Sequence, residues 1–170
     1  MSESLKAQLP ILARHEGGWD GYYRYYNAAG DKTDEHRSRL LCRFPDANTY
    51  HQTNLYFWLD GKTENRDFPT KVADGRLVFY TEIDGWAADE PLDTHKRTTL
   101  LNWTRKDDPS LYLYEMIQIS DCGQYRSRTW HWFRDNRLFQ RTLIDEQRVS
   151  EDWAAFDGKT FSYDDIAVGQ

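Results

Sequence analysis

The chain has 170 residues, a formal net charge of −6 and an aromatic content of 15%, with 7 Trp and 11 Tyr. This length suits one domain with its own core, so we expect residues 1–170 to form a single domain. The acidic balance argues against a general nucleic-acid binder. Two cysteines, Cys42 and Cys122, are too few for a disulfide framework or a zinc site. The sequence shows no signal-peptide pattern and no run that could span a membrane, which predicts a cytoplasmic protein without a membrane partner.

The elements predicted along the chain are almost all strands. A short helix is expected over residues 3–14, with an interruption at Pro10. Alternating patterns then predict strands at residues 18–27, 36–44, 51–59, 62–68, 76–82, 97–105, 110–120, 124–134 and 137–146, with a further short one near 83–88. A helical turn is expected near 153–156, followed by a last strand or clasp that includes Phe161 and Tyr163.

Turn chemistry separates these strands, as at Asp60-Gly61 and Asp135-Asn136, and no helical period lies between them. The pattern predicts an all-β fold of about eight to ten antiparallel strands, either a sandwich or a barrel. Strands linked by hairpins in simple order favour an up-and-down barrel, since closure removes exposed edges. A barrel of this size is filled by side chains or holds one small ligand.

The predicted hairpin of residues 125–133 and 137–143 is the most informative segment. If Asp135-Asn136 forms a two-residue turn, alternation gives one shared face. That face carries Arg128, Trp130, Trp132, Phe139, Arg141 and Leu143. Indole and guanidinium groups together suit a cavity wall that holds a flat, anionic ligand. The alternative is cation–π packing in a core or on a sheet surface.

The strand predicted at 110–120 has two distinct faces. One carries Tyr112, Tyr114, Met116 and Gln118, and the other carries Leu111, Leu113, Glu115, Ile117 and Ile119. A three-residue turn at 121–123 would place the tyrosine face beside Trp130 and Arg128, whereas a two-residue turn would reverse the faces. In the reversed register, Glu115 would be a buried carboxylate suited to acid–base chemistry, or it would form an ordinary salt bridge to an arginine.

Two further strands carry patterned polar residues. On the strand predicted at 51–59, Gln52, Asn54, Tyr56 and Trp58 alternate, which fits either a polar lumen or a solvated face. On the strand predicted at 36–44, Arg37, Arg39 and Arg43 alternate, which is typical of a solvated barrel exterior and alternatively of a carboxylate clamp. The five histidines lie in separate segments without metal-ligand spacing, so we expect no metal and no cofactor.

Gly17-Gly18-Trp19 resembles the Gly-x-Trp motif that opens the first strand of lipocalins and other calycins. The resemblance implies that Trp19 closes one barrel end beneath an arginine, for which Arg128 and Arg141 are the candidates. A wider similarity over residues 11–147 links the chain to an uncharacterised bacterial group of calycin-like proteins; it is carried by residues 11–19, 50–54, 113–118 and 128–133. Calycins bind small hydrophobic ligands, bilins, fatty acids or haem, and a few relatives are enzymes without a cofactor.

These patterns predict a protein that binds a small, partly aromatic or anionic molecule in a barrel lumen. The predicted ligand-binding residues are Asn54, Tyr56, Tyr112, Tyr114, Gln118, Arg128, Trp130, Trp132 and Arg141. The alternative is a cofactor-independent lyase, isomerase or cyclase in the same cavity, with Tyr114, Glu115 and Arg128 transferring protons and stabilising an anion. A third reading is a structural or protein-binding domain.

Overall fold

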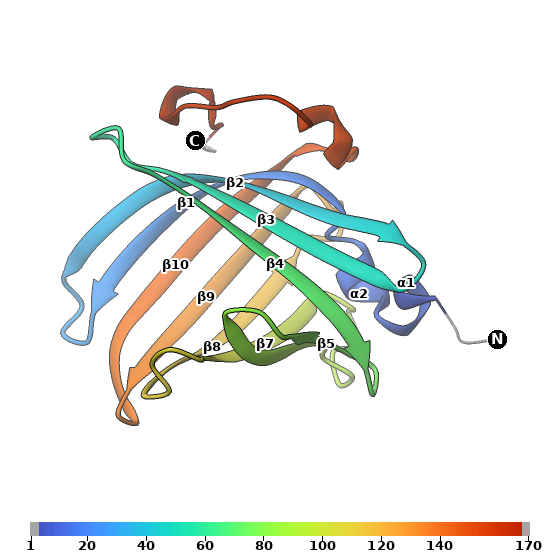
Figure 1. Ribbon diagram of the computed structural model, residues 1–170, viewed down its shortest axis with the longest axis horizontal. Coiled ribbons are helices and arrows are strands. Elements are labelled where there is room, and N and C mark those ends of the chain that lie inside the picture. The colour runs from blue at the N-terminus through green and yellow to red at the C-terminus, as the bar shows by residue number, and fades with distance from the viewer. Residues whose placement is uncertain (1–3, 168–170) are drawn as a thin grey trace.

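The computed structural model describes residues 4–167, which form a closed antiparallel barrel of ten strands (Figure 1). Each strand pairs with the next along the chain, and the last pairs with the first, as the sequence predicted. The strands are β1 (Gly17–Asn27), β2 (Lys32–Asp46), β3 (Thr49–Phe57), β4 (Thr63–Ala73), β5 (Arg76–Phe79), β6 (Ile83–Asp89), β7 (Thr98–Arg105), β8 (Leu111–Ile119), β9 (Tyr125–Arg134) and β10 (Arg137–Ser150). No helix among residues 4–167 is long and apolar enough to span a membrane.

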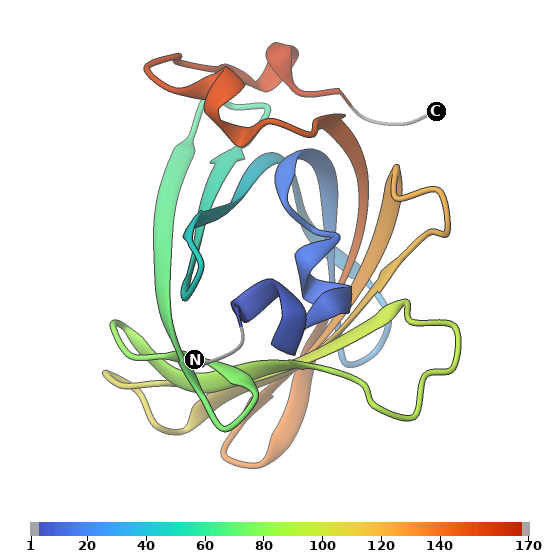
Figure 2. The same ribbon diagram turned by 90° about the vertical axis from the view of Figure 1, so that its right-hand side faces the viewer.

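Two short helices, α1 (Leu5–Gln8) and α2 (Pro10–Ala13), cover one end of the barrel (Figure 2). Pro10 interrupts the predicted helix because its ring removes a backbone donor, and it then begins α2. Asp89 of β6 accepts hydrogen bonds from the backbone N–H groups of Ile11 at 2.6 Å and Leu12 at 2.9 Å, which fixes α2 to the barrel wall.

Trp19 closes the same end from inside. It is fully buried, and its indole N–H donates to the carbonyl of His15 at 2.8 Å. The guanidinium carbons of Arg126 and Arg148 lie 4.4 and 4.3 Å from its ring centroid. Arginines therefore cover Trp19, but they are not the two expected, Arg128 and Arg141. Gly17 has φ +122°, and an added Cβ would collide with the Ser150 carbonyl, so only glycine fits at the start of this motif.

The β9–β10 hairpin has the predicted two-residue turn, with positive φ angles of 50° at Asp135 and 60° at Asn136. A β-bulge follows at Phe139. Phe133 of β9 pairs with Leu138 of β10, but the preceding residue of β9, Trp132, pairs with Gln140, so Phe139 has no partner across the ladder. The extra residue reverses every later face of β10. Arg141 and Leu143 therefore point outward with Phe139, and the predicted face shared with Trp130 and Trp132 is wrong for all three.

The β8–β9 connection also differs from the expected three-residue turn. The N–H of Ser120 donates to Tyr125 O at 2.8 Å, so four residues form the loop and Ile119, rather than Gln118, pairs with Arg126. The inward face of β8 is therefore the apolar one that carries Glu115. The predicted placement of the other face in the lumen is wrong, and the residues that turn outward are Tyr112, Tyr114, Met116 and Gln118.

Residues 151–167 form a C-terminal strap across the outside of β1 and β2 (Figure 1). Its two 3-10 turns are η1 (Trp153–Phe156) and η2 (Tyr163–Asp165). Arg39 lies between the rings of Phe156 and Phe161, at 4.7 and 4.3 Å, and forms two hydrogen bonds of 2.7 Å with Asp20. Arg37 lies 4.1 Å from the Tyr163 ring centroid. The strap is the predicted clasp, and it corrects the expectation that these arginines are solvated.

Candidate functional site

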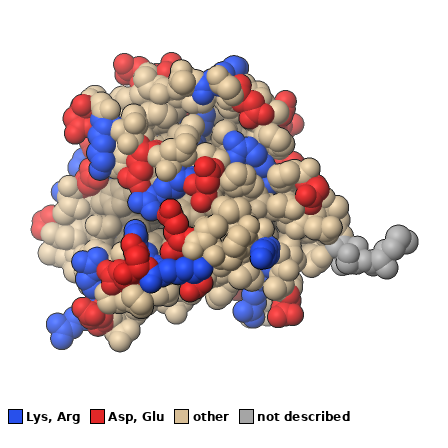
Figure 3. All heavy atoms as spheres, in the orientation of Figure 1, with Lys and Arg blue, Asp and Glu red and all other residues tan. Residues whose placement is uncertain are grey.

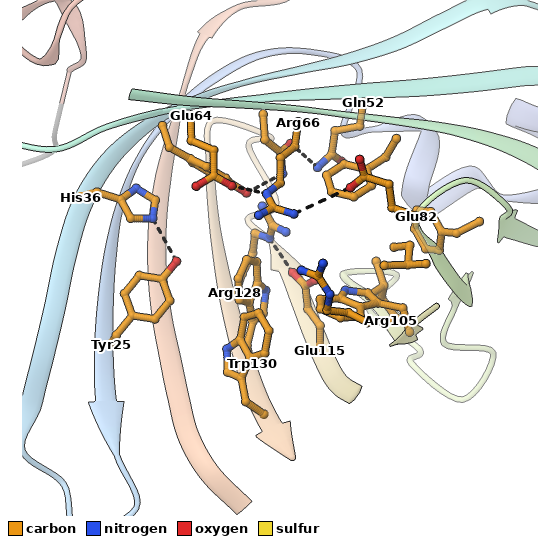
Figure 4. A pocket seen from close by; sticks show the side chains of 18 of the residues that line it. Tyr25, His36, Gln52, Glu64, Arg66, Glu82, Arg105, Glu115, Arg128 and Trp130 are labelled. Carbon is orange, nitrogen blue, oxygen red and sulfur yellow. Dashed lines mark hydrogen bonds and ion pairs between the residues drawn. The ribbon is translucent and has the colours of Figure 1, made fainter. Parts of the chain in front are cut away.

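The half of the lumen away from α1 and α2 contains a cavity of about 240 Å³ (Figure 4). Side chains from β1 to β4 and from β6 to β10 line it, with Phe79 of β5. Figure 4 shows Tyr25 and His36 on one side of this space, and Glu115, Arg128 and Trp130 on another. The barrel is thus filled at its closed end and hollow above.

Tryptophans make one wall of the cavity. Trp130 and Trp132 of β9 have ring centroids 5.4 Å apart, and Trp132 meets Trp103 of β7 edge to face, also at 5.4 Å. The N–H of Trp132 donates to Thr142 Oγ1 at 2.9 Å. The N–H of Trp130 has no partner among the described residues. This wall offers flat aromatic surface to the cavity, whereas the unpaired nitrogen of Trp130 is itself buried.

A network of buried charges forms the floor. The Nε of Arg128 donates to Glu115 at 2.5 Å, and its Nη1 lies 3.2 Å from Glu146 and 3.1 Å from the Tyr23 hydroxyl. Glu146 also pairs with Arg126. Two arginines and two glutamates therefore balance in charge, as a desolvated network must. For a buried Glu115, the sequence left two interpretations open, an acid–base group or a salt bridge to an arginine, and the structure contains the salt bridge.

The deepest part of the network reaches the barrel end. The Nη1 of Arg126 lies 3.2 Å from Nδ1 of His15 and 3.6 Å from the Cys42 thiol. Burial, reinforced by the positive charge of Arg126, lowers the pKa of His15 well below its ordinary value. His15 is therefore neutral at neutral pH, and its Nδ1 accepts from the guanidinium. Cys42 and Cys122 are both free thiols.

His36 lies in the opposite wall and was not assigned a role from the sequence. Its ring stacks on Tyr23 at 4.6 Å and lies 4.4 Å from the Trp58 ring centroid. Its Nδ1 lies 3.1 Å from the Arg37 carbonyl and must carry the proton, so Nε2 accepts from the Tyr25 hydroxyl at 3.0 Å. Burial lowers the pKa of His36 to about 4 and raises that of Tyr25 well above its ordinary value, so both groups are uncharged at neutral pH.

A hydrogen-bonded ladder on β3 supplies polar atoms to the same space. Tyr50 donates to Gln52 at 2.7 Å, Gln52 donates to Asn54 at 2.7 Å, and Asn54 donates to the Tyr56 hydroxyl at 2.8 Å. Because each side chain holds the next, the amides are fixed in orientation. Such a fixed row of amide and phenol groups orients a ligand without adding charge.

The barrel wall is thinnest beside β5, which has only four residues. β4 pairs with β5 only from Thr70 onward, so the first part of β4 has no partner on that side. There Arg66 pairs with Glu64, and it also lies 3.8 Å from Glu82, across the gap that β5 does not fill (Figure 4). Figure 3 shows acidic and basic side chains interleaved over this face. We call this Arg66–Glu82 pair the side latch.

The structure separates the predicted site residues into two groups. In the cavity wall lie Asn54, Tyr56, Glu115, Arg128, Trp130 and Trp132. On the outer surface, away from the cavity, lie Tyr112, Tyr114, Gln118 and Arg141. Tyr114 is 54% exposed, so it is not in position for chemistry in the lumen. The lining residues that sequence reasoning did not assign include Tyr25, His36, Arg66 and Trp103. Each lies on a strand, and the alternation of inward and outward positions along that strand was the signal that could have found it.

Comparison with known proteins gives the fold and no more. No family model matches the sequence. No curated protein matches it either. Among solved structures, an S-type phycobiliprotein lyase from Guillardia theta superposes with a TM-score of 0.64 at 13% identity, over 85% of this chain and 92% of that one.

Two other structures superpose at similar quality. A DUF3598-family protein of unknown function from Nostoc punctiforme has a TM-score of 0.61 at 14% identity over 81% of this chain, which spans about half of that protein (49%). Rv2717c from M. tuberculosis has a TM-score of 0.60 at 15% identity, over 83% of this chain and 96% of that one. At these identities, the likeness shows a shared β-barrel fold alone.

Proposed function

We propose that this barrel binds a small, partly aromatic molecule in its cavity. The observation that carries the proposal is the cavity itself, a space of about 240 Å³ bounded by tryptophan rings on one side and by a fixed polar ladder on the other. Binding sites for small molecules are mostly apolar hollows with a few placed polar groups. A purely structural barrel would have filled this space with side chains.

The size and shape of the wall favour a flat ligand. Ligand sites for drug-sized molecules measure about 300–1,000 Å³, so this cavity suits a smaller one. Trp132 meets Trp103 and Trp130 edge to face, and all three rings belong to residues that line the cavity. Aromatic ligands gain both buried area and ring contacts at such a wall. The barrel shared with a phycobiliprotein lyase supports a ligand in the lumen.

The second candidate is a lyase, isomerase or cyclase that needs no cofactor. Ionisable groups in the cavity wall favour it: Glu115 with Arg128, and His36 with Tyr25. These pairs could transfer a proton and stabilise negative charge if a bound substrate displaced one partner. Tyr114 drops out of this chemistry because it lies outside the lumen. Since each remaining group is already held by a partner, we place binding first.

Equilibrium dialysis against 2-ethylnaphthalene, an uncharged aromatic probe, tests the proposal. We expect binding at one site, and we expect Trp132→Ala to weaken it about threefold to tenfold through lost ring contacts. Tyr114→Ala, which removes an aromatic ring from the outer face of the same sheet, is the matched control and should leave affinity unchanged. Native mass spectrometry of freshly purified protein would reveal a co-purified ligand. Absence of any saturable binding would refute the proposal.

A further inference from the structure

We propose that the Arg128–Glu115 ion pair binds the polar end of an uncharged ligand in which a carbonyl stands beside an N–H, such as an aromatic carboxamide. This inference rests on the proposed binding function and assigns the polar group of the ligand. Two observations carry it. Both residues line the cavity, and their ion pair leaves one donor and one acceptor without a partner among the described residues.

The guanidinium of Arg128 has one nitrogen available to a ligand. Its Nε donates to Glu115 at 2.5 Å, and its Nη1 donates to the Tyr23 hydroxyl at 3.1 Å and to Glu146 at 3.2 Å. Its Nη2 has no hydrogen-bond partner among residues 4–167, and it is not one of the unpartnered atoms that are fully buried. Because Arg128 lines the cavity, Nη2 offers its N–H groups to a molecule bound there.

One carboxylate oxygen of Glu115 is available in the same way. Oε1 accepts the hydrogen bond from Arg128, whereas Oε2 has no partner in the described part of the chain and is not fully buried either (Figure 4). The Glu115 side chain is only 2% exposed, so it is almost enclosed by the protein. A polar atom in such a place is stabilised by a hydrogen bond, and a ligand N–H can donate one.

The second ion pair of the floor is closed to a ligand. Both oxygens of Glu146 are held by arginines, Oε2 by Arg126 and Oε1 by Arg128. The Nη2 of Arg126 has no partner among the described residues, but it is fully buried, so nothing in the cavity reaches it. Of the two pairs, only Arg128–Glu115 can therefore contact a bound molecule.

This ion pair selects against a charged ligand group. A carboxylate would be attracted to Nη2 of Arg128 but would meet the negative charge of Glu115, and an ammonium group would meet the opposite conflict. Either ion would also lose its hydration and add a net charge to a balanced pair. A carboxamide offers its carbonyl oxygen to Arg128 and its N–H to Glu115 without any net charge. It therefore satisfies both atoms of the pair.

The aromatic wall begins directly beside this ion pair. The guanidinium carbon of Arg128 lies 5.4 Å from the ring centroid of Trp130, and the ring of Trp132 lies 5.4 Å further along the same strand. A flat ligand with its amide group at Arg128 therefore places its ring against the two tryptophans. The polar group lies at the floor of the cavity, and the ring lies above it.

Four probes of nearly equal shape test this assignment on the wild-type protein. At pH 7, 2-naphthamide is neutral with an acceptor and a donor, 2-acetonaphthone has the acceptor alone, 2-ethylnaphthalene has neither, and 2-naphthoate is an anion. In equilibrium dialysis, 2-naphthamide should bind about threefold to tenfold more tightly than 2-acetonaphthone and at least about tenfold more tightly than 2-ethylnaphthalene. It should also bind at least about tenfold more tightly than 2-naphthoate.

Glu115→Gln should change this order of affinities. The glutamine carbonyl can still accept from Nε of Arg128, but an amide N–H then replaces Oε2. We expect 2-naphthamide to bind about threefold to tenfold more weakly than to wild type, and 2-naphthoate about tenfold more tightly. Glu35→Gln, in an exposed glutamate that pairs with Lys32, is the matched control and should change neither affinity. Circular dichroism checks the fold of each variant, and the wild-type series needs no variant.

The outcomes distinguish the two levels of proposal. If 2-ethylnaphthalene or 2-acetonaphthone binds as tightly as 2-naphthamide, the ion pair does not recognise an amide, while binding in the lumen stands. Tighter binding of 2-naphthoate than of 2-naphthamide to wild type would overturn the selection against charge in the same way. If none of the four probes binds saturably, the proposed function fails, and this inference fails with it.

Discussion

Replacement of Glu146 by Gln tests how the floor of the cavity is held together. The Glu146 side chain is 0% exposed and is shared by two arginines, Arg126 and Arg128. Glu146→Gln preserves the volume but leaves two buried guanidinium groups with Glu115 as their one carboxylate partner in this network. Breaking a buried ion pair from one side costs about 3–5 kcal/mol, because the remaining charge stays desolvated. For a chain of this length, we expect the melting temperature to fall by about 6–20 °C.

The control is Glu64→Gln, the same substitution in another glutamate that pairs with an arginine of the cavity wall. The Glu64 side chain is 31% exposed, so solvent screens its pairing with Arg66. Pairs of this kind contribute about 0–1 kcal/mol, which predicts a shift below about 4 °C. Differential scanning calorimetry and urea titration would measure both variants. Equal effects of the two substitutions would refute the argument from burial.

A double variant separates the stabilising energy of the ion pair from the cost of leaving one buried charge unpaired. Arg126→Met combined with Glu146→Gln removes one charge of each sign and leaves Arg128 paired with Glu115. We expect the double variant to be more stable than Glu146→Gln alone, since no buried guanidinium then lacks a partner. A double variant that loses the sum of the two single effects would show that the groups act independently.

Three other predictions concern acid stability, the barrel end and ligand exchange. Burial lowers the pKa of His36 from 6.5 to about 4. The contribution of neutral His36 to stability should therefore be complete above pH 6.5 and fall by up to about 3 kcal/mol as the pH drops toward 4. The urea midpoint of His36→Asn should vary less over this range than that of the wild type, and a variant of an exposed histidine, His131→Asn, is the control. Trp19→Ala should lower the free energy of unfolding by about 3–5 kcal/mol, and an unchanged melting temperature would contradict the closed end described here. Glu82→Gln, which opens the side latch, should speed release of 2-ethylnaphthalene up to about fivefold in stopped-flow dilution, and an unchanged rate would contradict exit through the side latch.

The sequence predicted the barrel because strand spacing and turn residues are local signals. It also placed Arg128, Trp130 and Trp132 on one face, since alternation within a single strand is fixed by the pleat. Predictions of which faces two neighbouring strands share were less secure, because they depend on the length of the turn between the strands. The bulge at Phe139 turned Arg141 outward, and one extra loop residue before β9 turned Tyr114 outward. A shift of one residue reverses a whole face, and neither shift leaves a clear mark in the sequence.

The apolar pattern of β8 did indicate which face of the strand points inward. Its inward face carries Leu113 and Ile117, the more hydrophobic side, whereas the tyrosine side faces solvent. Weighing that pattern above the assumed turn length would have placed Glu115 correctly in the lumen. The roles of Arg37 and Arg39 could not be found in this way, because they depend on the C-terminal strap, which follows them by more than a hundred residues along the chain and packs on the outside of the barrel.

The inward face of β9 carries two kinds of environment along one strand. At the closed end, Arg126 and Arg128 are held by glutamates, because a charge removed from water is stable only with a fixed partner. Further along, the rings of Trp130 and Trp132 line the cavity. Arg128 belongs to both environments, because it is held by carboxylates and also lines the cavity. In the binding that we propose, the buried ion pairs therefore hold the wall in place, and the tryptophan rings supply its apolar contact area.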